Sequence, residues 1–247
     1  MRPFLTAQWR NLIMINYAVE PSLLAPLVPR GTVLDSHDGI TYLSLVAFLF
    51  DDTRVLGVPI PWHRTFEEVN LRFYVRRELP GEVRRGVTFI RELVPRFAIA
   101  ATARLLYNEP YHALPMRHSF GAATPDGLPS TVEYAWRSQH AWTSLRAEAR
   151  DAGRHAAVGA LEEFITEHYW GYTRQRNGST VEYQVEHPRW KVWTADLATI
   201  RGDLGGVYGS ALGEVLSRVP SSAFIADGSA VAVHAPSRLP DVQRRTD

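Results

Sequence analysis

The chain has 247 residues, 45% hydrophobic and 21% charged, so it is long and apolar enough to bury a substantial core. Its 27 basic residues nearly cancel its 26 acidic ones, and a net charge of +1 provides no strong field for a nucleic-acid backbone or an anionic membrane. The absence of cysteine excludes disulfides, thiolate nucleophiles and sulfur-ligated metals. Only one lysine is present, Lys191, so amine chemistry has a single side-chain candidate.

The beginning of the chain does not look like a targeting or membrane segment. Arg2, Gln8, Arg10 and Asn11 interrupt residues 1–18, which therefore match neither the apolar region of a signal peptide nor a membrane span. We expect a cytoplasmic protein that binds neither nucleic acid nor membrane.

Short segments rich in β-branched and aromatic residues dominate the chain, which is typical of a strand-rich protein. The predicted strands cover residues 11–19, 40–50, 66–77, 86–94, 131–137, 180–187 and 230–234. Both alternating faces of 40–50 are apolar, which predicts a strand buried on both sides. Ahead of the strand at 180, Asn177-Gly178-Ser179 predicts a tight hairpin turn rather than a glycosylated loop.

Two short helices are predicted. Pro95 suits the first turn of a helix over 97–107, and residues 160–168 carry Leu161, Phe164 and Ile165 at helical spacing. No linker or repeat divides the chain, so we expect a single domain over 1–235 and a loose polar tail over 236–247. The expected fold class is mainly β (α+β), a largely antiparallel sheet, curled or closed, with a few short helices.

Residues 66–75 carry the most informative chemical pattern, because period-two alternation sorts them into two different faces. The polar face presents Glu68, Asn70, Arg72 and Tyr74, and the apolar face Val69, Leu71, Phe73 and Val75. One interpretation is a solvated outer face of an antiparallel sheet. The other is the wall of a polar pocket, in which Arg72 binds a substrate carboxylate and Glu68 transfers a proton and pairs with Arg72 at rest. Periodicity alone does not separate the two.

Six stretches are informative as an ordered set that runs along most of the chain. They are Tyr17-Ala-Val-Glu-Pro, 38–48, Glu68-Val-Asn-Leu-Arg-Phe-Tyr-Val75, Gly86-Val-Thr-Phe89, 103–113 and 161–169. Together they resemble the uncharacterised YqjF-like family, DUF2071, which in turn resembles the acetoacetate decarboxylase superfamily. The resemblance implies an antiparallel β-barrel or strongly curved sheet around a central pocket, and small carboxylated or carbonyl substrates.

The resemblance places Glu68 where the decarboxylases have a carboxylate that points into the pocket. Their segment with the Schiff-base lysine and its neighbouring lysine falls on Pro110-Tyr111-His112, where both lysines are absent. A phenol or an imidazole does not form an imine, which puts the imine route in doubt. Lys191 lies far from this motif and is either a structural lysine beside tryptophans or an unexpected nucleophile.

The side chains at this motif suggest other roles. Tyr111 and His112 either form a proton-transfer pair, with His112 titrating near neutrality and Tyr111 donating to a developing oxyanion, or only contact a ligand. Arg104 either completes a carboxylate clamp with Arg72 or pairs with Glu109 on the surface. The nine histidines show no metal-ligand spacing, so we expect neither a metal nor a cofactor.

Two functions from different classes remain open at this point. The first is an enzyme that acts by proton transfer on a small carboxylated or carbonyl substrate. The second is a non-catalytic metabolite-binding or sensor protein that uses the same pocket. The candidate catalytic residues are Glu68, Tyr111 and His112, and the candidate ligand-binding residues are Asn70, Arg72, Tyr74 and Arg104. The expected partner is a small organic acid, and a homo-oligomer is compatible with the sequence.

Overall fold

The computed structural model describes residues 2–60, 64–95 and 110–240, with only the backbone described at 196–197. The predicted helix over 97–107, and with it Arg104, lies outside the described residues.

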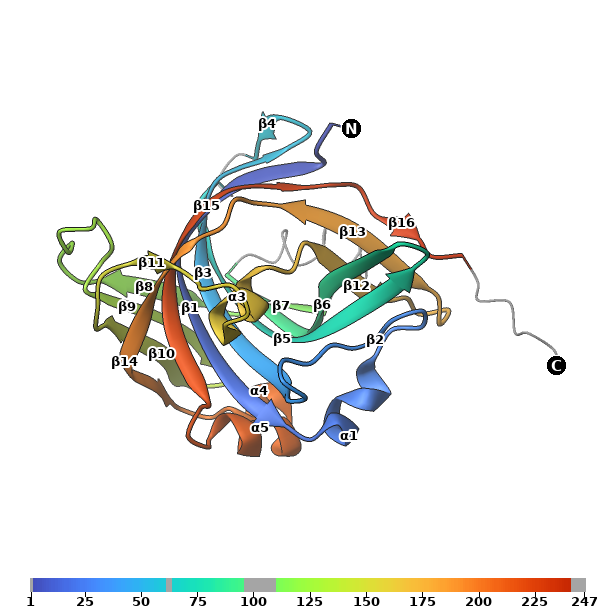
Figure 1. The fold of residues 1–247 in the computed structure, drawn as a ribbon. Helices are drawn as coiled ribbons and strands as arrows, with labels where there is room; N and C mark the ends of the chain where they lie inside the picture. Colours follow the sequence, from blue (N-terminus) through green and yellow to red (C-terminus); the bar gives the residue numbers. More distant parts are fainter. Residues whose placement is uncertain (1, 61–63, 96–109, 241–247) are drawn as a thin grey trace.

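One strongly curved sheet contains all the strands of the described ranges, and part of it closes into a ring (Figure 1). The ring consists of β1 (Leu5–Val19), β3 (Thr41–Val55), β5 (Phe66–Leu79), β6 (Glu82–Val94), β12 (Trp170–Arg174), β13 (Thr180–Glu186) and β15 (Ser222–Val233). Their order is β13-β12-β6-β5-β3-β1-β15. The ring closes because β13 also pairs with β15, at Val185↔Val233 and Glu186↔Ala232.

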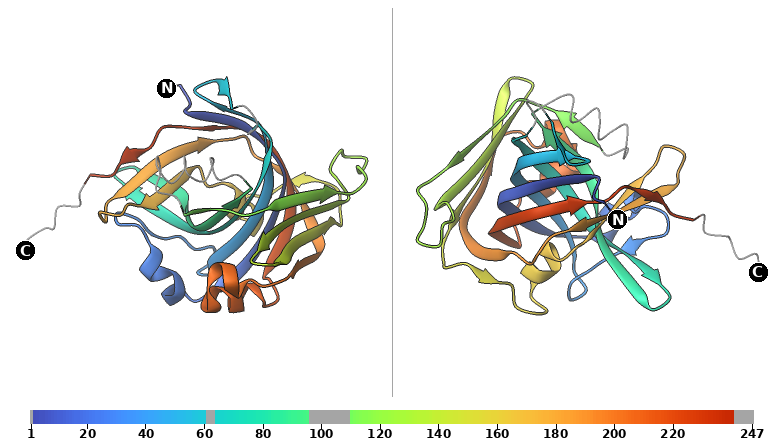
Figure 2. Two further views of the ribbon diagram at one scale, coloured as in Figure 1. Left: turned by 180° about the vertical axis from the view of Figure 1, so that it is seen from behind. Right: turned by 90° about the horizontal axis from the view of Figure 1, so that it is seen from above.

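The sheet continues beyond β15 into a second layer outside the ring (Figures 1 and 2). This layer comprises β14 (Lys191–Arg201), β10 (Ala141–Ala149), β9 (Thr131–Ser138) and β8 (Met116–Phe120). The short strands are β2 (Val33–Leu34), β4 (Val58–Pro59), β7 (Tyr111–Ala113), β11 (Arg154–His155) and β16 (Ser237–Arg238). Most neighbours are antiparallel, as predicted, but β12 and β7 both run parallel to β6, so the sheet is mixed.

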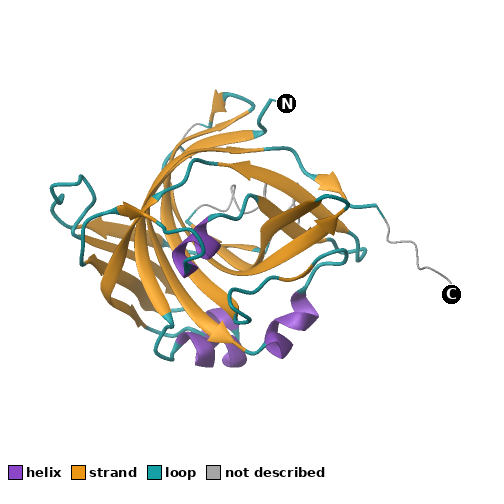
Figure 3. Ribbon diagram, in the orientation of Figure 1, coloured by secondary structure: helices purple, strands orange, loops and turns teal. Residues whose placement is uncertain are grey.

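The helices within the described ranges are few and short, as the sequence predicts (Figure 3). They are α1 (Pro21–Leu24) with the 3-10 turn η1 (Ala25–Leu27), α3 (Leu161–Thr166), α4 (Gly205–Tyr208) and α5 (Ser210–Leu216). In Figure 1, α3 lies over the opening of the ring, whereas α4 and α5 lie outside it. None of the helices in the described ranges is long and apolar enough to cross a membrane.

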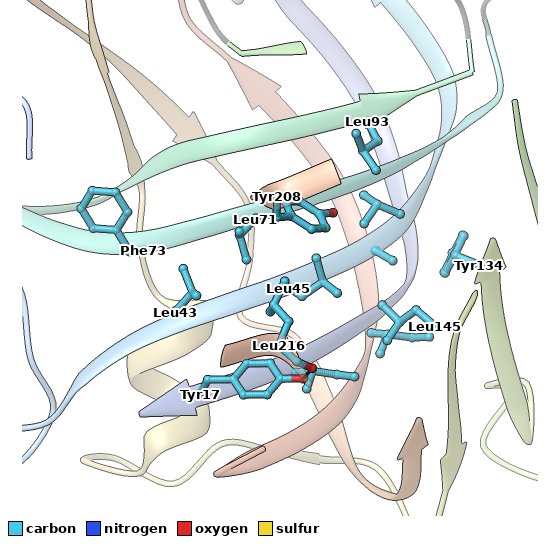
Figure 4. Close-up of a cluster of buried hydrophobic side chains, with 14 of the residues drawn as sticks. Tyr17, Leu43, Leu45, Leu71, Phe73, Leu93, Tyr134, Leu145, Tyr208 and Leu216 are labelled. Carbon is cyan, nitrogen blue, oxygen red and sulfur yellow. Dashed lines mark hydrogen bonds between the residues drawn. The ribbon is translucent and has the colours of Figure 1, made fainter. Parts of the chain in front are cut away.

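The two faces of the ring bury separate apolar clusters. The outer cluster packs the ring against the second layer and α4–α5, and Figure 4 labels Tyr17, Leu43, Leu45, Leu71, Phe73, Leu93, Tyr134, Leu145, Tyr208 and Leu216 in it. The inner cluster packs the opposite face of the ring strands against α3. It includes Leu12, Met14, Val46, Phe48, Phe66, Tyr74, Val87, Phe164, Ile165 and Phe224. Strands covered on both sides explain why 40–50 is apolar on both faces.

Two local predictions have clear outcomes. Gly178 has a φ of 80° between β12 and β13, and the side chain of Asn177 accepts a hydrogen bond from the Ser179 amide, so the predicted hairpin turn is confirmed. The predicted loose tail over 236–247 is ordered at its start. There β16 pairs with β13, and Leu239 is buried in the outer cluster, because this polar segment supplies backbone partners to a strand edge.

Candidate functional site

The polar face of β5 is buried inside the ring. Its four side chains are Glu68, Asn70, Arg72 and Tyr74, which are 3%, 2%, 9% and 0% exposed. The interpretation as a solvated outer face is therefore wrong. The alternate residues Val69, Leu71, Phe73 and Val75 pack into the outer cluster, so residues 68–75 are covered on both faces, and the polar face has no bulk water to satisfy it.

At one end of this face, Glu68 is held by two side chains. Asn70 donates to Glu68 Oε1 at 3.1 Å, and the Tyr111 hydroxyl donates to Glu68 Oε2 at 3.2 Å. β7 lies parallel to β6 on the side away from β5, with Tyr111 opposite Glu92 and Glu92 opposite Asn70, so the Tyr111 side chain reaches Glu68 across β6. Glu92, which pairs with Asn70 across β5 and β6, is only 2% exposed and adds a second buried carboxyl group that the sequence analysis missed.

Tyr111 and His112 do not face the same region. Tyr111 packs against the inner cluster, whereas His112 lies opposite Leu93, a member of the outer cluster. Successive residues of a strand point to opposite faces, so adjacent side chains in β7 do not meet at one ligand. The structure therefore places Tyr111, but not His112, beside Glu68.

Arg72 does not pair with Glu68, which corrects the expectation from the sequence. Its Nη2 donates to the Ile165 carbonyl at 3.2 Å, and its guanidinium carbon lies 5.7 Å from the centre of the Tyr74 ring. Four residues of strand separate Arg72 from Glu68, about 13 Å at the usual rise, with Asn70 between them. Within the described part of the chain, Arg72 makes no ion pair, and its buried Nε has no hydrogen-bond partner.

A chain of hydrogen bonds fixes Tyr74 across four strands. The Tyr74 hydroxyl lies 2.7 Å from Ser44 Oγ, and Ser44 Oγ is also 2.6 Å from Asn16 Oδ1. Asn16 Nδ2 then donates to Ser222 Oγ at 2.9 Å. Because these groups are mutually satisfied, the phenol is held in a fixed position next to Arg72.

Beyond Tyr74 the structure reveals a carboxylate–imidazole pair that the sequence analysis did not single out. His168 Nε2 lies 3.6 Å from Asp35 Oδ2, and both side chains are almost fully buried. Burial is the largest influence on His168 and lowers its pKa, although Asp35 opposes the shift. For Asp35, burial acts toward a higher pKa, but His168, Arg85 and the Ser36 amide together outweigh it and lower the pKa. The pair was missed because Asp35, which follows β2, and His168, which follows α3, come together only in the folded chain.

Lys191 is not part of this site. It is the first residue of β14 and is exposed, and its backbone amide donates to Asp227. The side chain of the single lysine is therefore not enclosed in a pocket, as an imine-forming lysine is. Among the described residues, no three His, Asp or Glu side chains gather as metal ligands do.

A groove of about 490 Å³ adjoins the inner face. Ala7 and Val231, both members of the inner cluster, line it together with His187. His187 stacks on Trp190 with ring centres 4.2 Å apart, and burial lowers its pKa. The groove is therefore lined by one imidazole ring, which stacks on Trp190, together with small apolar residues and the charged side chains of Asp52, Arg54 and Glu186.

Solved structures show the class to which this fold belongs. Acetoacetate decarboxylase from Legionella pneumophila matches 96% of this chain and 87% of its own, with a TM-score of 0.66 and 11% identity. An acetoacetate decarboxylase-like enzyme from Sphingomonas wittichii matches 98% and 95%, with a TM-score of 0.67 and 14% identity. The enduracididine biosynthesis enzyme MppR complexed with pyruvate matches 98% and 92%, with a TM-score of 0.66 and 12% identity. The chain therefore has an acetoacetate decarboxylase-like fold.

The sequence identifies the family within that class. The model of DUF2071, described as an uncharacterised conserved protein, matches residues 6–230. The protein belongs to this family. The uncharacterised protein YqjF of Bacillus subtilis is a distant homologue, 25% identical over 200 residues that make up 76% of this chain and 74% of YqjF. The resemblance predicted from the ordered sequence motifs is confirmed.

Proposed function

We propose that the protein binds a small organic acid inside the ring and acts on it by proton transfer. In this proposal Arg72 binds the carboxylate, Tyr74 and Asn70 contact the ligand, and Glu68 exchanges a proton with it, assisted by Tyr111. The observation that carries the proposal is the buried guanidinium of Arg72, which makes no ion pair with any described residue and lies on a face closed off from solvent.

Charge supports a carboxylated ligand. A buried arginine is costly unless an anion or several acceptors satisfy it, and among the described residues Arg72 has one carbonyl contact and a buried Nε without a hydrogen-bond partner. A carboxylate accepts two parallel hydrogen bonds from a guanidinium, which matches its planar donor geometry. A small acid is therefore a better partner for Arg72 than a neutral molecule.

Proton transfer is the chemistry that the buried acid favours. Glu68 is held by Asn70 and Tyr111, which fix its orientation as a proton-transfer group requires. The exposed position of Lys191 supports a reaction that does not pass through an imine. MppR, which shares the fold, has been solved with pyruvate, so pyruvate and acetoacetate are the first probes to use.

The test combines binding with solvent exchange. Calorimetry with pyruvate and with acetoacetate should detect binding to the wild-type protein and its loss in Arg72→Met. In D2O, proton NMR should show protein-dependent deuterium incorporation next to the carbonyl group, slowed in Glu68→Gln. Binding without exchange would instead support a metabolite-binding or sensor protein. Equal affinity of wild type and Arg72→Met for both acids would contradict the proposal.

A further inference from the structure

His168 is the most unusual titratable group in the interior. It follows α3 by two residues, and its ring lies 4.7 Å from the Tyr74 ring and 5.0 Å from the Phe164 ring. Its Nε2 lies 3.6 Å from Asp35 Oδ2, just beyond hydrogen-bond distance, and neither Nε2 nor the buried Nδ1 has a hydrogen-bond partner among the described residues. A buried imidazole nitrogen without a partner is uncommon in a folded protein and calls for an explanation.

The surroundings of His168 determine which nitrogen carries the proton. The carboxylate of Asp35 is an acceptor, so the hydrogen of a neutral ring is favoured on Nε2, which leaves a lone pair on Nδ1. Arg72 and Arg85 are the cations that act on the ring, and both favour its neutral form. Asp35 is itself shared, because Arg85 Nε lies 3.1 Å and Arg76 Nη1 3.5 Å from its oxygens.

Arg72 and His168 flank the same side chain. The guanidinium carbon of Arg72 is 5.7 Å from the Tyr74 ring centre, and the His168 ring centre is 4.7 Å from it. A three- or four-carbon acid bound through its carboxylate at Arg72 has its neighbouring carbons within a few ångströms of that guanidinium. His168 lies on the Tyr74 side of Arg72, and Glu68 lies on the other side beyond Asn70, so the two groups can act at different atoms of a bound acid: Glu68 at the carbonyl oxygen and His168 at the carbon next to the carbonyl.

We propose that Nδ1 of His168 is a proton acceptor for an oxo acid bound at Arg72, with Asp35 as the positioning residue. This inference rests on the proposed function and deepens it. The C–H bond next to the ligand carbonyl breaks, its proton moves to Nδ1, and its electron pair forms an enolate with the charge on the carbonyl oxygen. Return of a proton from Nδ1 regenerates the acid, so no further reactant is needed.

The experiment uses the full chain labelled with 15N-histidine and pyruvate as the probe. In the free protein, His168 should be the neutral tautomer with its hydrogen on Nε2, and pyruvate should shift its Nδ1 resonance. In D2O, His168→Gln should slow deuterium incorporation into the pyruvate methyl group by about 100-fold, a typical loss for a general base. Circular dichroism should show that the variant is folded.

Two further variants separate a chemical role from a structural one. Asp35→Asn removes the countercharge of the imidazolium, so the pH profile of exchange should move to lower pH, which a purely structural effect would not cause. His118→Gln is the matched control. His118 also contacts a carboxylate, with Nδ1 2.7 Å from Glu67 Oε1, but this pair is exposed on the other face of β5. The His118→Gln variant should therefore exchange pyruvate protons at the wild-type rate.

The outcomes separate this inference from the proposed function. If Arg72→Met abolishes pyruvate binding while His168→Gln exchanges at the wild-type rate, the role of His168 is wrong and the ligand site stands. If His168→Gln does not fold, the wild-type protein provides the test. An Nδ1 resonance of His168 that does not shift when pyruvate binds would also show that the role of His168 is wrong. If neither pyruvate nor acetoacetate binds through Arg72, both proposals fail.

Discussion

Glu182 on β13 accepts a 2.7 Å hydrogen bond from Arg77 on β5, although β12 and β6 separate these strands in the sheet. Arg84 on β6 donates to the same oxygen at 3.1 Å. The side chain of Glu182 is 8% exposed, and those of Arg77 and Arg84 are 14% and 24% exposed. Arg84 also pairs with Glu82 at 2.9 Å, and Glu182 is the carboxylate that both partly buried cations of the β5–β6 hairpin share.

Glu182→Ala should be strongly destabilising, because it leaves two guanidinium groups close together without their shared anion. We expect a loss of about 3 kcal/mol in the free energy of unfolding, measured by urea denaturation. Glu214→Ala is the control, since Glu214 pairs with Arg218 on the exposed surface of α5 and should cost under about 0.5 kcal/mol. Similar losses in the two variants would show that the buried network adds nothing beyond a surface pair.

Arg72→Met should weaken pyruvate binding by about 2 to 4 kcal/mol, because the ligand carboxylate loses a charged, desolvated donor. Calorimetry measures the change. Arg76 on the same face is an unsuitable control because it contacts Asp35, whereas Arg218 pairs only with Glu214 on the surface. Arg218→Met should bind pyruvate as the wild type does. Equal losses in both variants would make Arg72 an ordinary charged residue.

Borohydride treatment in the presence of acetoacetate or pyruvate should trap no adduct at Tyr111 or His112. Neither side chain is a primary amine, and Lys191 is exposed on β14. Decarboxylation of acetoacetate should stay near the uncatalysed rate. Peptide mapping by mass spectrometry is the measurement, and a reduced imine on Lys191 would show that this lysine is a nucleophile after all.

The free energy of unfolding should fall as the pH drops below about 6.5, the ordinary pKa of histidine. Burial lowers the pKa of His168 in the folded state, so the unfolded chain binds a proton there first as the pH decreases. The stability supplied by the neutral ring is present above pH 6.5 and is lost toward the lower folded pKa. Asp35 titrates below this range.

Urea denaturation at pH 7 and pH 5 measures this dependence. His168→Gln should show a smaller decrease between the two pH values than the wild type, whereas His118→Gln should keep the wild-type decrease. An unchanged decrease in His168→Gln would mean that another group, such as His187, whose pKa partial burial also lowers, controls the acid sensitivity.

The sequence predicted the strand-rich fold and the two faces of β5, because period two is a local property of the chain. It did not show whether Glu68 and Arg72 faced water, since that depends on the closure of a ring by β13 and β15. The alternation that sorted β5 also separates Tyr111 from His112, so this part of the site was predictable from β7 alone. The contact between His168 and Asp35 was not predictable, because the two residues are distant along the chain and no local spacing marks them as neighbours.

The pairing of β1 with β15 constrains the synthesis of this protein. Leu5 pairs with Val233, so the first strand of the ring receives one of its neighbours only when almost the whole described chain is present. At a translation rate of 5 to 20 residues per second, the edge of β1 remains unpaired for roughly 10 to 40 s on the ribosome. That edge is long and apolar on its buried faces, the kind of nascent segment that associates with other chains. Ring closure is therefore late in synthesis, and we expect β1 to be the strand that most needs protection from association before β15 is available.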